Sequence, residues 1–120
     1  MKHSVLTVEP DPTQCSQIIH ALIEANYDAI PVHSNYALHE LYNLREFDQN
    51  APSAVILSDQ LPGEFLERLC RYIGEFENIL LIGFGHNVSG ALFTKQVSRS
   101  TRELLKALND LLPADLTSYP

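Results

Sequence analysis

Basic residues are scarce in this sequence. Eight lysines and arginines face fifteen aspartates and glutamates, which leaves a formal net charge of −7. A surface of this sign repels nucleic-acid phosphates and anionic lipids, so we expect no direct nucleic-acid partner and no membrane association. The two cysteines, Cys15 and Cys70, are too few for a disulfide scaffold, and each lies in an apolar helical pattern. The low cysteine count favours a reducing, cytoplasmic location.

Long apolar stretches are also missing. No segment approaches the ~20 apolar residues of a membrane span. The first four residues lead directly into a short apolar run at 5–8, whereas a secretory signal needs a longer apolar region. The 120 residues suit one domain. We expect residues 1–113 to form this domain and 114–120 to be a C-terminal tail.

Four short apolar runs alternate with segments of helical period. The runs lack the in/out alternation of one-sided strands and cover 5–8, 29–32, 54–57 and 79–82. Helical patterns cover 12–26, 35–47, 63–76 and 101–112. Asp11 and Pro12 start the first pattern, and Ser100 with Glu103 forms a capping box before the last. A fifth strand is expected at 91–94. This order predicts an α/β doubly wound, five-stranded parallel sheet.

Polar side chains follow several of these strands. In a doubly wound sheet the functional crevice lies beyond the carboxyl ends of the strands. The residues expected there are Glu9, Pro10, Asp11, Ser58, Asp59, Gly83 and Lys95. We expect Lys95 to form ion pairs with the carboxylates, a structural role rather than a catalytic one. Asp59 lies one residue beyond Ser58, and strand alternation predicts that its side chain turns away from the crevice.

The order of these residues resembles the receiver domain of two-component response regulators over nearly the whole chain. The resemblance rests on residues 5–12 (VLTVEPDP), 55–63 (VILSDQLPG), and Thr94–Lys95 followed by 102–105 (RELL). It implies a flavodoxin-like, CheY-like fold. It also implies that Ser58 stands where receivers carry the phosphorylated aspartate.

Further departures from the receiver pattern point to lost phosphoryl chemistry. Pro10 replaces one of the two acidic residues that hold Mg²⁺ in receivers, Gly83 replaces a hydroxyl residue, and Gln96 replaces the proline after the lysine. Leu92 stands in place of the aromatic switch residue. A serine hydroxyl also needs a neighbouring base to attack phosphorus, whereas an aspartate is already ionised. We therefore expect no metal, no cofactor and no catalytic residues.

The connection between the fourth and fifth predicted strands is short. Only residues 84–90 join them, and a helical crossover needs about ten to twelve residues. The fourth helix of the receiver fold is therefore expected to be shortened or absent. This would expose an apolar interaction surface at Phe84, Val88, Leu92 and Phe93, unless a loop and neighbouring helices cover the gap.

These observations predict a degenerate receiver, or pseudo-receiver, that signals without phosphorylation. We expect it to act through a protein partner or a homodimer, in bacterial signal transduction or transcriptional regulation, and to be fused to a downstream output domain. It is not expected to be an enzyme. Two alternatives stay open: an atypical receiver that is phosphorylated on Asp59, and a sensor that binds a small molecule in the vacant crevice.

Overall fold

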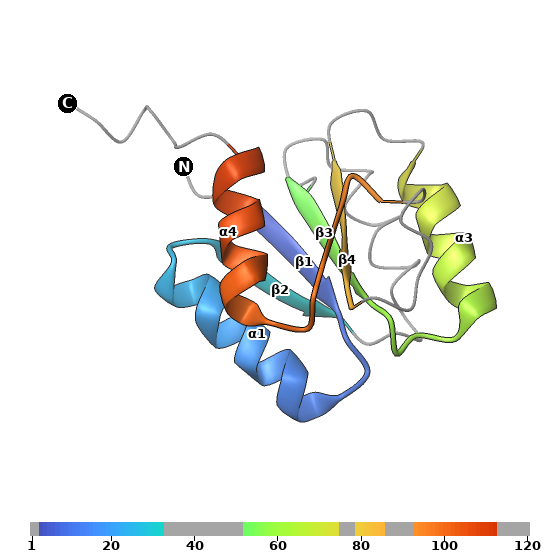
Figure 1. Ribbon diagram of the computed structural model, residues 1–120, viewed down its shortest axis with the longest axis horizontal. Helices are drawn as coiled ribbons and strands as arrows, with labels where there is room; N and C mark the ends of the chain where they lie inside the picture. Colours follow the sequence, from blue (N-terminus) through green and yellow to red (C-terminus); the bar gives the residue numbers. More distant parts are fainter. Residues whose placement is uncertain (1–2, 33–51, 75–78, 86–92, 113–120) are drawn as a thin grey trace.

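The computed structural model describes residues 3–32, 52–74, 79–85 and 93–112 (Figure 1). Its elements are β1 (Ser4–Val8), α1 (Pro12–Glu24), β2 (Asp28–Val32), β3 (Ala54–Ser58), α3 (Gly63–Ile73), β4 (Leu80–Phe84), β5 (Lys95–Val97) and α4 (Thr101–Leu111). The five strands are parallel and lie in the order β2-β1-β3-β4-β5. This is the flavodoxin-like strand order, so the predicted fold class is confirmed.

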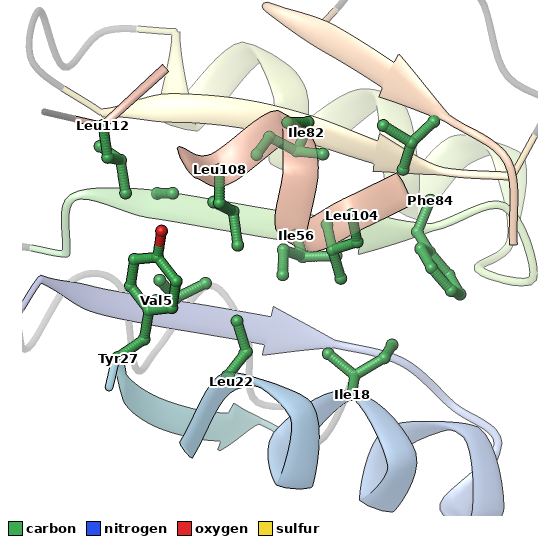
Figure 2. Packing of buried hydrophobic residues seen from close by; sticks show 13 residues of the cluster. Val5, Ile18, Leu22, Tyr27, Ile56, Ile82, Phe84, Leu104, Leu108 and Leu112 are labelled. Atoms are coloured by element: carbon green, nitrogen blue, oxygen red, sulfur yellow. The ribbon is translucent and has the colours of Figure 1, made fainter. Parts of the chain in front are cut away.

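The sheet is covered on both faces, as its continuous apolar strands predict. Alternate strand residues such as Val5, Ile56 and Ile82 pack with α1 and α4 on one face (Figure 2). Their neighbours Leu6 and Val55 pack with α3 on the other face. Burial on both sides explains why strands β1 and β3 contain no charged residues and only small hydroxyl side chains among their polar ones.

Local signals fix where two of the helices begin. The Asp11 side chain accepts a hydrogen bond from the Thr13 N–H at 3.3 Å, and Pro12 occupies the first helical turn of α1. The Ser100 hydroxyl likewise accepts from the Glu103 N–H at 3.4 Å at the start of α4. Both starts agree with the caps predicted from the sequence.

The predicted position of the fifth strand is wrong. The structure places β5 at Lys95–Val97 instead of 91–94, and β4 extends to Phe84. A strand at the edge of a sheet needs little apolar sequence, and in β5 only Val97 is buried. The apolar run before it therefore misled the prediction. Ten residues, 85–94, now separate the two strands, rather than seven.

Several predictions concern residues outside the described ranges. They are the helix at 35–47, the tail at 114–120, and the shortened or absent fourth helix, whose segment includes 86–92. None of the helices within the described ranges is long and apolar enough to cross a membrane.

Helix α4 offers a matched test of the core. Leu108 is fully buried between α4 and the sheet, whereas Leu111 on the same helix is 36% exposed. Leu108→Ala should lower the free energy of unfolding by about 3 kcal/mol, because it leaves a cavity between packed layers. Leu111→Ala should cost less than about 1 kcal/mol. Urea denaturation measures both, and equal losses would contradict this packing.

Candidate functional site

One arginine joins the ends of three strands. Glu9 follows β1, Asp59 follows β3, and Arg99 follows β5 two residues after Val97. The Nη1 of Arg99 donates to Asp59 Oδ1 at 2.7 Å, and its Nη2 donates to Glu9 Oε1. The carboxylate side chains are only 1% and 3% exposed, compared with 27% for Arg99. Two buried carboxylates therefore share one partly buried cation.

Ser58 belongs to the same cluster. Its hydroxyl oxygen accepts one hydrogen bond from Arg99 Nη1 at 3.1 Å and another from the Gln60 N–H at 3.0 Å. The residue is 1% exposed. Both contacts hold the hydroxyl as an acceptor at the start of the turn after β3, and the nearby arginine does not act as a base.

The aromatic ring of Phe84 also contacts the guanidinium of Arg99. Its central carbon lies 5.1 Å from the centre of the Phe84 ring, within the range of a cation–π contact. Burial lowers the pKa of Arg99, but hydrogen bonds and charges from Glu9 and Asp59 outweigh burial and raise that pKa. The side chain therefore remains a permanent cation in the cluster.

Gly85 brings the backbone unusually close to Asp59. Its φ is +121°, a conformation that residues with a side chain rarely adopt. A Cβ at this position would lie 2.1 Å from Asp59 Oδ2. The Gly85 N–H donates to the Val97 carbonyl at 2.8 Å, and the Gln96 side chain donates to the Gly85 carbonyl at 2.8 Å. Gly85 therefore links β5 to the wall of the site.

The structure brings together three of the residues expected in the crevice, namely Glu9, Ser58 and Asp59. Asp11 caps α1 and is exposed, and Pro10 is exposed beside it. Lys95 does not lie at the expected position. It is the first residue of β5, it pairs in register with Ile82 of β4, and it is exposed. This follows from the shift of β5 along the chain, which puts Arg99 at the carboxyl edge in place of Lys95.

The expected orientation of Asp59 is also corrected. Alternation along a strand predicted that its side chain turns away from the crevice. β3 ends at Ser58, however, so the pleat no longer dictates the direction of the next side chain. Arg99 Nη1 donates to both side chains, which places Asp59 in the same cluster as Ser58.

The described residues do not form the expected apolar interaction surface. Phe84 is fully buried in the core beneath α4, because β4 extends one residue further than predicted. Phe93 is partly buried, and its ring lies only 3.0 Å from where a Cβ on Gly83 would be. Gly83 therefore has a packing role here. Val88 and Leu92 lie outside the described residues.

The cluster does not fit the Mg²⁺ that the receiver resemblance implies. Mg²⁺ demands about six oxygen ligands in octahedral geometry. Glu9 and Asp59 already pair with a guanidinium that repels a divalent cation, and Pro10 supplies no side-chain oxygen. Within the described ranges, no group of three or more His, Cys, Asp or Glu side chains is placed to hold a metal ion.

Sequence reasoning missed Arg99 and Gly85. A signal for Arg99 was present, because the capping box at Ser100 fixes the start of α4. The residue before this cap must lie near the carboxyl end of the preceding strand, and that residue is Arg99. The close approach of Gly85 to Asp59 had no comparable signal, because it depends on contact between distant segments.

Removing the Arg99 cation should destabilise the fold strongly. Arg99→Ala leaves two buried carboxylates without their partner, so we expect a loss of about 3 kcal/mol in the free energy of unfolding. Arg71→Ala is the matched control, since Arg71 pairs with Glu67 in an exposed position. It should cost less than about 1 kcal/mol. If urea denaturation shows a smaller loss of unfolding free energy for Arg99→Ala than for Arg71→Ala, the buried cluster is refuted.

Gly85 should tolerate no side chain. Gly85→Ala combines an unfavourable φ with a collision against the Asp59 carboxylate, and we expect a loss of about 2 kcal/mol in unfolding free energy. Gly63→Ala is the control, because a Cβ there meets nothing within 4 Å at the start of α3. It should be neutral or stabilising. Thermal unfolding compares the two variants, and a stable Gly85→Ala protein would disprove the close approach.

Comparisons with known proteins agree on the fold. No protein-family model matches the chain, and no curated protein matches its sequence. Solved structures do match. CheY4 of Vibrio cholerae, a chemotaxis protein, is 19% identical with a TM-score of 0.73, over 93% of this chain and 100% of the other. A structure of the histidine kinase ThkA with the response regulator protein TrrA matches at 22% identity and TM-score 0.72, over 94% and 100% of the two chains.

A third match is a pseudo-receiver. The pseudo-receiver domain of the CikA protein is 18% identical with a TM-score of 0.67, over 94% of this chain and 98% of the other. At these identities the comparisons establish a shared architecture. The structural neighbours of this chain are CheY-like response-regulator receiver domains, and they include a pseudo-receiver.

Proposed function

We propose that this chain is a receiver-like signalling module that works without phosphorylation. It transmits its signal by protein–protein contact or by dimerisation, within bacterial two-component signalling or transcriptional regulation, and it is not an enzyme. The fold shared with response regulators supports the signalling class, and the likeness to a pseudo-receiver supports a variant without phosphoryl transfer. A downstream output domain would receive the signal.

The ion-pair cluster of Glu9, Asp59 and Arg99 carries this proposal. Phosphoryl transfer to an aspartate requires a free carboxylate oxygen and a metal ion that neutralises the phosphate. Here the guanidinium binds one oxygen of each carboxylate, and its positive charge repels a metal ion from both. The cluster supplies its own cation, so its geometry is complete without Mg²⁺ and without a phosphoryl group.

A second candidate is an atypical receiver that is phosphorylated on Asp59. The observation that favours it is the position of Asp59 beside Ser58 in the cluster. In this reaction an Asp59 carboxylate oxygen attacks the phosphorus of a small donor such as acetyl phosphate. Acetate leaves with its bonding electron pair, and an acyl phosphate forms. Arg99 would then have to release Asp59 before the attack.

Intact mass spectrometry separates the two candidates. The protein is incubated with acetyl phosphate and Mg²⁺ beside an active receiver that serves as a positive control. Phosphorylation-independent signalling predicts an unchanged mass for this chain while the control gains one phosphoryl group. A gain that is lost in Asp59→Asn but kept in Ser58→Ala would establish the second candidate and overturn the first.

A further inference from the structure

A groove runs between α1 and the carboxyl end of β2, beside the cluster, and the two share Glu9. Its volume is about 630 Å³, within the usual range of small-molecule sites. Its apolar wall includes Pro12, Ile19 and Ile23 from α1, and Pro31 and Val32 from β2. All of its lining residues belong to the described ranges. Ile23 is 59% exposed, so part of the apolar wall is open to solvent.

No lysine or arginine lines this groove, and its titratable lining residues are Glu9, Cys15 and His20. Residues 9–32, which include both of its walls, contain Glu9, Asp11, Glu24 and Asp28 but no lysine or arginine. Asp11, Glu24 and Asp28 are exposed. An apolar surface that is bordered by negative charge favours a cationic ligand and disfavours an anionic one. It also disfavours a second copy of this chain, which has a net charge of −7.

Glu9 brings a buried carboxylate to the groove wall. Its Oε1 binds Arg99, but its Oε2 is buried and has no hydrogen-bond partner within the described part of the chain. Glu9 and Asp59 together carry two negative charges against the single charge of Arg99. Burial raises the pKa of the Cys15 thiol, and the charge of Glu9 raises it further. Cys15 and Glu9 both line the groove.

We propose that the groove between α1 and β2 binds a small organic ammonium ion with an apolar body. The apolar part lies against Ile19 and Ile23, and the ammonium group lies at the Glu9 end. One buried carboxylate oxygen cannot replace the water shell of Mg²⁺. The same oxygen can stabilise a single positive charge nearby, such as that of an ammonium ion. This inference does not depend on the proposed signalling role, because the groove exists whether or not Asp59 is phosphorylated.

Three probes of equal length test the charge preference. Hexylammonium, hexan-1-ol and hexanoate are titrated into the full chain, and binding is followed by backbone amide NMR shifts. Hexylammonium should bind at least about tenfold more tightly than hexanoate, with hexan-1-ol between them. Shifts should concentrate on α1 and β2. Equal affinity for all three probes, or tighter binding of hexanoate, would overturn the proposal.

Two variants on α1 test the location. Ile19→Asn places an amide on the apolar wall and should weaken hexylammonium binding by about tenfold. Gln17→Asn is the control, because Gln17 is exposed on the same helix and does not line the groove. It should leave the affinity unchanged. Unchanged affinity in Ile19→Asn would place the ligand elsewhere and refute the site.

The thiol of Cys15 gives a readout that needs no substitution. Hexylammonium should slow the labelling of Cys15 by N-ethylmaleimide, because the ligand covers the groove. Cys70 is only 5% exposed, and burial raises its pKa to about 11, so it should stay unlabelled while the fold is intact. Full-rate labelling of Cys15 in saturating hexylammonium would contradict the proposal.

Glu9→Gln should reduce the affinity for hexylammonium to that for hexan-1-ol, provided that Cys70 stays protected.

Discussion

The guanidinium of Arg99 ties together the carboxyl ends of β1, β3 and β5 through Glu9, Ser58 and Asp59. Both carboxylates are almost completely buried, so each depends on this cation for the interactions it loses with water. The ring of Phe84 and the backbone of Gly85 close the site from the β4 side. These contacts fix the positions of all three strand ends. They therefore also fix where the loops that follow the strands begin.

The cluster also decides which chemistry the sheet edge supports. A receiver that switches by phosphorylation needs a carboxylate and a metal that gain a phosphoryl group and lose it again. In this structure the positive charge at the sheet edge belongs to a side chain of the protein, which pairs with both carboxylates. Two carboxylates against one guanidinium leave a negative charge, and that charge borders an apolar groove along α1. The ion-pair cluster and the proposed cation-binding groove therefore both involve Glu9.

Much of the fold could be predicted from the sequence, because its signals are local. The apolar runs of β1, β3 and β4 are buried on both faces, and the caps at Asp11 and Ser100 mark helix starts. β5 was misplaced because an edge strand needs only one buried residue, Val97, while a more apolar run precedes it. That error of four residues put Lys95 in the place of Arg99, and a separate error of one residue at the end of β4 left Phe84 on a surface instead of in the core. The orientation of Asp59 escaped prediction because strand alternation ends with β3.

A crystal structure of the full chain in Mg²⁺ and beryllium fluoride, which mimics a phosphoryl group, tests the central claim most directly. The account predicts electron density for the Arg99 guanidinium between Glu9 and Asp59, with neither metal nor fluoride bound to either carboxylate. A Mg²⁺ ion between these carboxylates, beryllium fluoride on Asp59, and an Arg99 side chain turned to solvent would contradict it.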